Sequence, residues 1–124
     1  MSVTAAVTAL KRRYPRMCRD GLTPMYQTDS SESLEAILED AHRFPDQIKT
    51  CREWLRACNV IKTTRTTHDT YMYKHEVEYE VGHWISHLSF LVAVQLEGVP
   101  MLQSTDRLYA GWLPLGVVRP GAVS

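Results

Sequence analysis

The sequence predicts a mainly α fold, with about five helices in one compact domain and a short irregular or β-hairpin segment at its C-terminal end. Its 124 residues lie within the usual size of one domain, roughly 100–150 residues. Apolar residues recur at intervals of three and four along most of the chain, whereas the last 24 residues contain helix breakers every few positions. We therefore expect a single helical domain over residues 1–124, with a basic N-terminal helix at 1–14, a helical core at 29–97 and an irregular segment at 101–124.

The first two helices are predicted from apolar stripes with breakers at their ends. The first covers residues 3–14 and ends before Pro15, with an apolar face of Val3, Val7 and Leu10. The second opens at Asp29 and Glu32, a pair that resembles a capping box, and it ends before the Phe-Pro step at 44–45. Its apolar stripe is made of Leu34, Ile37, Leu38 and Ala41.

A third helix is expected to start at Pro45, because the missing N–H of proline costs nothing in a first helical turn. One face then carries Ile48, Cys51, Leu55 and Cys58. Both cysteines are therefore predicted to be buried core thiols. The following segment, "NVIKTTRTTHDT", is rich in threonine and is also compatible with an extended strand.

The fourth and fifth helices are predicted on either side of Gly82. Asp69 or Thr70 is a good N-cap for the fourth helix, and Gly82 suits its C-terminal end. Ser86 can cap the fifth helix, whose residues 88–96 are apolar nearly all round. We expect this helix to form the core of the domain.

The C-terminal segment favours a short strand or hairpin around residues 108–112. Its apolar residues Trp112, Leu113 and Leu115 either cover the helical core or form an exposed contact patch, and we favour the cover. The last six residues, 119–124, are expected to be frayed.

Charge is balanced overall but is unevenly distributed. The formal net charge is zero, which removes the simplest argument for a nucleic-acid partner. An acidic face of Glu32, Glu35, Glu39 and Asp40 follows a basic stretch that includes Lys11, Arg12, Arg13 and Arg16, and a second basic strip holds Lys49, Arg52 and Arg56. These groups either pair with one another as solvated surface or contact a partner.

The stretch "YMYKHEVEYEVGHWISH" (71–87) admits three interpretations. A metal site would use His83 and His87, which are four residues apart. The segment between them lacks the glutamate of the H-E-x-x-H metalloprotease motif, and we predict no metal. A helix-turn-helix would place its turn at Gly82, although the second helix then offers no Arg or Lys for DNA bases. Core packing is the interpretation that we favour.

Catalysis has little support in the sequence. We see no phosphate-binding glycine loop, no nucleophile elbow and no cysteine with an evident histidine partner, so we expect neither an enzyme nor a cofactor. Arg16 and Arg19 flank Cys18 and would lower the pKa of its thiol if they approached it. The odd cysteine count and the absence of a signal or membrane-spanning segment predict a cytoplasmic protein with no membrane partner.

Residues 66–100 resemble small uncharacterised proteins that bacterial plasmids and phages encode. The resemblance begins with a Thr-Tyr step at residues 70–71 and continues with Lys74 and His75, then with Glu78 and Gly82. An aromatic-Ile-Ser step follows, and the resemblance ends in an apolar helix closed by Leu-x-Gly. The corresponding residues from the aromatic-Ile-Ser step onward are Trp84, Ile85, Ser86, Leu96 and Gly98. The resemblance implies a mobile-element origin. We also expect Tyr71, Lys74, His75 and Glu78 to form a polar cluster.

Together these features predict a non-enzymatic binding protein of a bacterial mobile element. The leading hypothesis is a stoichiometric inhibitor of a host defence complex, in the manner of an anti-CRISPR protein. Its acidic face would contact a host protein or a ribonucleoprotein complex. The alternative is a small nucleic-acid-binding or transcriptional accessory protein that places its basic strips on phosphates.

Overall fold

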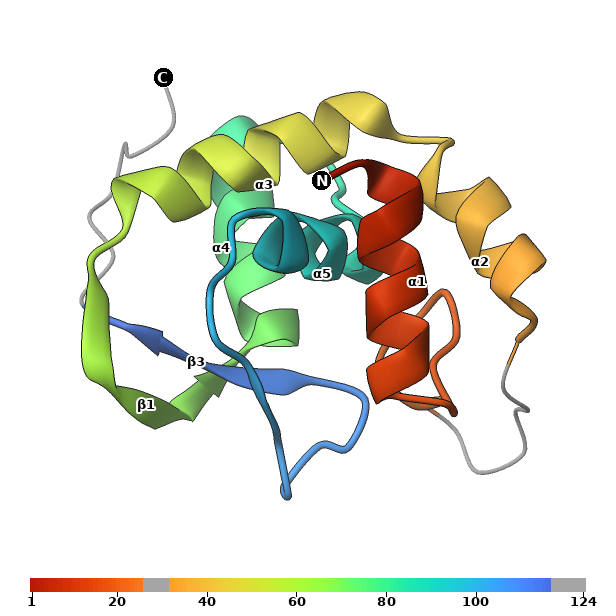
Figure 1. The fold of residues 1–124 in the computed structure, drawn as a ribbon. Helices are drawn as coiled ribbons and strands as arrows, with labels where there is room; N and C mark the ends of the chain where they lie inside the picture. Colours follow the sequence, from red (N-terminus) through yellow and green to blue (C-terminus); the bar gives the residue numbers. More distant parts are fainter. Residues whose placement is uncertain (26–31, 117–124) are drawn as a thin grey trace.

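Five helices and a three-stranded antiparallel sheet make up the structure, a computed structural model that describes residues 1–25 and 32–116 (Figure 1). In chain order the elements are α1 (Val3–Arg13), α2 (Leu34–Ala41), α3 (Pro45–Ala57), β1 (Val60–Asp69), α4 (Thr70–Val81), α5 (His87–Leu96), β2 (Leu102–Gln103) and β3 (Gly111–Leu115). Within these residues, no helix is both long and apolar enough to cross a membrane.

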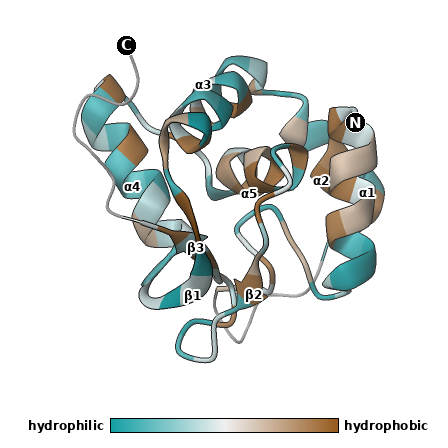
Figure 2. Cartoon of the chain, turned by 60° about the vertical axis from the view of Figure 1, so that its left-hand side comes forward, coloured by the Kyte–Doolittle hydropathy of each residue, from teal (hydrophilic) through white to brown (hydrophobic). Residues whose placement is uncertain are grey.

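Helix α5 lies at the centre of the fold and contacts α1, α2, α3 and α4 (Figure 1). Every residue from His87 to Val94 is buried, and the helix is mostly hydrophobic in colour where it lies among its neighbours (Figure 2). A helix that is apolar all round has to be enclosed on all sides to remove that surface from water. The prediction that this helix forms the core is confirmed.

The predicted helix ends agree with the structure at four positions. Pro45 begins α3, Asp69 caps α4 through the N–H of Met72, and Ser86 caps α5 through the N–H of Ser89. Gly82 ends α4 with a left-handed φ of 77°, a conformation that costs little only without a Cβ. Helix α2, however, is capped by Ser33 through Ala36, and Asp29 lies outside the described residues.

The sheet has the strand order β1-β3-β2. Strand β1 pairs with β3 through Val60 and Leu115, Arg65 and Leu113, and Asp69 and Trp112, with an irregular register between these pairs. Ten residues of β1 therefore lie against a five-residue strand, and β1 must bulge. Most of β1 stays solvent-exposed along its length.

The prediction of a mainly α fold is wrong, because residues 60–69 form a full strand within the supposed helical core at 29–97. The β-branched residues of this segment favour a strand, but the segment has no alternating apolar pattern because one long edge faces solvent. Its partner strand also begins more than forty residues later, at Gly111. The fold is a compact α/β domain.

The C-terminal hairpin is more regular than predicted. Strands β2 and β3 pair through Leu102 and Trp112 and through Gln103 and Gly111, whereas Leu108 lies in the connecting loop. Leu113 and Leu115 are fully buried, which confirms that they cover the core, whereas Trp112 of the same predicted group is only partly buried. Residues 119–124, for which fraying was predicted, lie outside the described part of the chain.

Candidate functional site

The four residues of the predicted polar cluster come together on one side of helix α4. Lys74 Nζ lies 3.2 Å from Glu78 Oε2 and 5.1 Å from the centroid of the Tyr71 ring. His75 Nδ1 lies 2.5 Å from Glu78 Oε1, and its ring meets that of Tyr71 edge-on at 4.6 Å. Their spacings of three and four residues place these side chains on one helical face.

Glu78 holds this cluster to the loop that follows α4. Its Oε2 atom also accepts a hydrogen bond of 2.9 Å from the N–H of Ile85. Burial raises the pKa of Glu78, but the hydrogen bonds from Ile85, His75 and Lys74 outweigh it and the pKa of this carboxyl is lowered overall. The ammonium of Lys74, whose side chain is only 6% exposed, therefore has an ionised partner.

His87 adds a buried ring to the cluster that the sequence did not indicate. Its Nδ1 lies 2.7 Å from the carbonyl oxygen of Asp20, and its Nε2 lies 2.8 Å from Thr70 Oγ1. The rings of Tyr71 and Tyr109 approach it edge-on at 5.5 and 6.4 Å. Burial lowers the pKa of His87 to about 4 and keeps the ring neutral.

The structure separates the two histidines of the rejected metal interpretation. His87 points into the fold, whereas His83 is exposed and contacts the carbonyl oxygen of Trp84. Over the described ranges, no group of three His, Cys, Asp or Glu residues is placed to hold a metal ion. The helix-turn-helix interpretation is wrong because the helix after Gly82 is enclosed by other helices and cannot enter a DNA groove.

Only two of the four residues of the predicted acidic face are free of ion pairs with described residues. Glu32 precedes α2 and receives four hydrogen bonds from Arg19, the shortest of 2.6 Å. Asp40 lies 3.8 Å from Arg43. Glu35 and Glu39 are exposed, one helical turn apart, and form no ion pair with any described residue.

The two basic strips lie on different parts of the molecule. Lys11, Arg12 and Arg13 form the last turn of α1, at the end of that helix that points away from α3 (Figure 1). Lys11 donates to the carbonyl oxygens of Pro15 and Met17, and Arg13 donates to that of Met101. Among the described residues, Arg12 and Arg16 have no hydrogen-bonded partner and are exposed.

Two arginines of the second basic strip form ion pairs with Glu97, an acid that the sequence gave no reason to select. Arg52 Nε donates to Glu97 Oε2 at 2.6 Å, and Arg56 Nε donates to Glu97 Oε1 at 2.7 Å. The partners are more than forty residues apart, so no local spacing could have revealed them. Lys49 makes no ion pair within the described chain and is exposed.

Burial makes the thiols of all three cysteines harder to ionise. It raises the pKa of Cys51 to about 12 and that of Cys58 to about 11. Burial also raises the pKa of Cys18, and neither Arg16 nor Arg19 lowers it, contrary to the expectation from their positions in the sequence. The prediction that Cys51 is a buried core thiol is confirmed, while Cys58 is partly buried at the end of α3.

Comparison with protein-family models, curated proteins and solved structures finds no match to this chain. The candidate surfaces therefore have to be argued from their own chemistry.

Proposed function

We propose that this protein binds a protein or ribonucleoprotein target through the acidic surface of α2 and acts as a stoichiometric inhibitor. The observation that supports the proposal is the pair Glu35 and Glu39, both exposed and without an ion pair in the described chain. Four residues of helix correspond to a rise of about 6 Å, so two unneutralised carboxylates follow each other along the surface. A groove lined by Lys and Arg is the complementary surface.

The peripheral position of α2 suits this role. Ile37 and Ala41 anchor the helix on its inner side, and it contacts only α1 and α5 among the major element pairs. Its outer carboxylates contribute nothing to that packing. Glu35 lies in the first turn of α2, where an acid suits the helix dipole. Glu39 lies in the second half of the helix, where the dipole does not favour an acid, and like charges at this spacing slightly destabilise a helix, so stability gives no reason for Glu39.

The proposed targets are bacterial defence complexes that hold nucleic acid in a cationic channel, which makes the protein an anti-CRISPR-like inhibitor encoded by a mobile element. The resemblance of residues 66–100 to plasmid and phage proteins favours that origin. Glu32 is not part of the binding surface in this proposal, because Arg19 already neutralises it.

The test is displacement of labelled target DNA from a panel of purified CRISPR effector ribonucleoproteins, followed by fluorescence anisotropy. We expect saturation at one inhibitor per effector, and a loss of at least tenfold in potency for Glu35→Lys/Glu39→Lys. The matched control is Glu53→Lys/Asp106→Lys, which reverses two exposed charges away from α2. An unchanged potency of the α2 variant, or no inhibition of any effector by the wild-type protein, would overturn the proposal.

A second candidate function is nucleic-acid binding through the basic end of α1. It is favoured by Arg12 and Arg16, which are exposed and have no hydrogen-bonded partner among the described residues. Phosphate contacts make affinity fall steeply with salt, so binding of mixed DNA and RNA is measured at roughly 50 and 200 mM salt. Saturable, salt-sensitive binding that Arg12→Gln/Arg16→Gln weakens supports this function, and no binding at the lower salt excludes it.

A further inference from the structure

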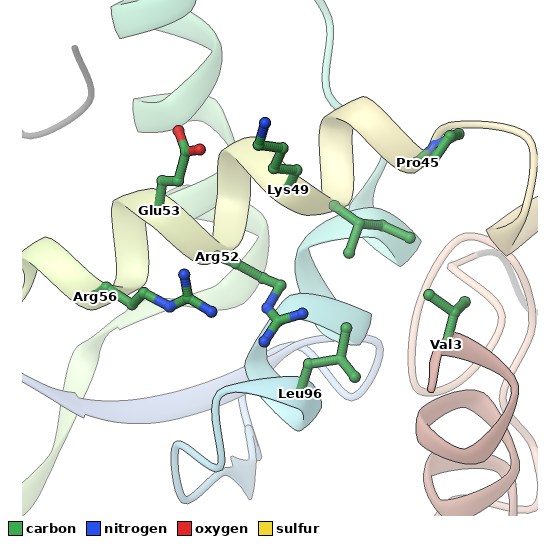
Figure 3. Close-up of a pocket in the computed structure, with 8 residues that line it drawn as sticks. Val3, Pro45, Lys49, Arg52, Glu53, Arg56 and Leu96 are labelled. Carbon is green, nitrogen blue, oxygen red and sulfur yellow. The ribbon is translucent and has the colours of Figure 1, made fainter. Parts of the chain in front are cut away.

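Helices α1, α3 and α5 enclose a groove with an apolar floor and a charged wall. Its volume is about 240 Å³. The lining residues are Val3, Pro45, Ile48, Lys49, Arg52, Glu53, Arg56 and Leu96. Figure 3 shows Val3 across the groove from α3, and Leu96 of α5 below Arg52.

The charged wall carries an excess positive charge. Arg52 and Arg56 share the single carboxylate of Glu97, so these three side chains sum to one positive charge. The hydrogen bond from Arg56 is the largest cause of the lowered pKa of Glu97, so this carboxylate stays ionised. The formal charges of Lys49 and Glu53 cancel in the sum over the lining residues. In Figure 3 both side chains extend to the side of α3 away from Arg52.

Arg52 is oriented for a further contact. Its Nε atom is used by Glu97, whereas no described residue accepts from its two terminal nitrogens. A guanidinium has five N–H donors in a planar fork, so four remain for an anion, enough for a bidentate bond to a carboxylate or phosphate. Glu97 holds the side chain in place, which lowers the entropy that is lost when a ligand binds.

We infer that this groove binds a small amphiphilic anion, with a carboxylate or phosphate on the terminal nitrogens of Arg52 and a short hydrocarbon chain on Val3, Ile48 and Leu96. The size favours a small ligand, since sites for drug-sized molecules occupy about 300–1,000 Å³. The floor favours a hydrocarbon chain, because free nucleotides or inorganic anions would leave it in contact with water. This inference does not depend on the acidic surface of α2.

The ligand inferred for the second basic strip is a small anion and not the phosphate backbone of a nucleic acid. A nucleic-acid backbone needs a row of exposed cations along its path. Here Glu97 offsets one of the two charges of Arg52 and Arg56, and Lys49 points away from Arg52, so the wall beside the apolar floor offers one net positive charge and no row of cations (Figure 3).

The test is titration of the full-length protein with octanoate and octyl phosphate, followed by calorimetry and by amide chemical shifts in ¹H–¹⁵N spectra. Saturable binding of either anion is expected to shift the amides of Val3, Ile48, Arg52 and Leu96. Octanol lacks the charge and acetate lacks the chain, and each is expected to bind at least tenfold more weakly. The tighter of the two anions then identifies the preferred headgroup.

Two variants and one control locate the binding. Arg52→Gln removes the cation while Arg56 keeps two hydrogen bonds to Glu97, and it is expected to weaken octanoate binding at least tenfold. Val3→Asp is also expected to weaken octanoate binding at least tenfold, because it places a carboxylate on the apolar floor. An acid in the first turn of α1 suits the helix dipole, so the substitution does not destabilise that helix end. Arg12→Gln makes the same change away from the groove and is expected to have no effect. Equal binding of octanol, or octanoate binding that survives Arg52→Gln and Val3→Asp, would overturn the inference.

Discussion

The Nε2 atom of His87 lies 2.8 Å from Oγ1 of Thr70, and this contact joins the first residue of α5 to the first residue of α4. The same Thr70 oxygen accepts from the N–H of Gly111, the first residue of β3, so its hydroxyl proton is available for His87. The carbonyl oxygen of Asp20 can only accept, so His87 Nδ1 is the donor at that end. The chain of bonds is complete only when the imidazole is neutral.

We predict that His87 makes the protein less stable in mild acid. Burial lowers the pKa of this ring to about 4, against an opposing effect of the hydrogen bond to the Asp20 carbonyl and with smaller lowering contributions from Lys74 and His75. An unfolded histidine titrates near 6.5. Between these values the unfolded chain binds a proton that the folded chain excludes, so the free energy of unfolding falls as the pH is lowered through this window. Linkage gives a loss of about 2 kcal/mol between pH 7 and pH 5.

This prediction is checked by urea unfolding of the wild type and His87→Gln at both pH values. The carboxylates titrate in both proteins, so the difference between their pH dependences isolates His87. Identical pH dependences would show that the ring is not held neutral in the folded state.

We predict that the two members of the Lys74–Glu78 pair respond differently to replacement. Glu78→Ala leaves the buried ammonium of Lys74 and the N–H of Ile85 without their acceptor, and we expect a loss of about 3 kcal/mol in the free energy of unfolding. Lys74→Met removes the charge but keeps the apolar stem, so we expect a change of less than about 1 kcal/mol. Denaturant unfolding of both variants at pH 7 tests this asymmetry, and an equal loss in the two would contradict it.

The sequence was most informative where one segment determines its own structure. The caps at Asp69 and Ser86, the left-handed Gly82 and the apolar helix that follows were all predictable from neighbouring residues. The same holds for Tyr71, Lys74, His75 and Glu78, because helical spacing alone places them together. The cluster was predicted correctly for that reason.

Contacts between distant segments were not predictable in this way. Strand β1 depends on pairing with β3, and its exposed length hides the alternation that would have identified it. Glu97 reaches Arg52 across 45 positions, and the Gln47 side chain contacts Trp84 and Ser86 across 37 and 39. Nothing in one sequence connects such residues, so the sequence alone left open whether the second basic strip pairs with an acid of the same chain.

We predict that Gly82→Ala lowers the free energy of unfolding by about 1 kcal/mol. The residue ends α4 at φ 77°, and a Cβ there would meet no atom within 4 Å outside its immediate neighbours, so the cost comes from backbone conformation. Asparagine tolerates this conformation better than alanine, so Gly82→Asn is expected to recover part of the loss. Thermal unfolding of the three proteins measures both effects, and an asparagine variant less stable than the alanine variant would contradict this explanation.

We predict a larger loss, about 2–4 kcal/mol, for Gly21→Ala, through a steric clash and not through backbone strain. A Cβ at Gly21 would lie 2.4 Å from the carbonyl oxygen of Tyr109, which also accepts the N–H of Leu22 at 2.9 Å. Backbone cannot move aside as a side chain can, so the two segments must separate and weaken this bond. Tyr109 would move with them, and its ring packs against Tyr71 and His87.

Gly116→Ala is the matched control for this substitution, because its added Cβ would come no closer than 3.5 Å to any atom outside its immediate neighbours. We expect its effect to stay within about 0.5 kcal/mol, as for an ordinary surface change. Urea unfolding at pH 7, with equal slopes for all three proteins, compares the two variants directly. If Gly21→Ala were as stable as Gly116→Ala, the close approach of Gly21 to Tyr109 would not exist in the folded protein, and the hydrogen bond of His87 to the neighbouring Asp20 carbonyl would also have to be reconsidered.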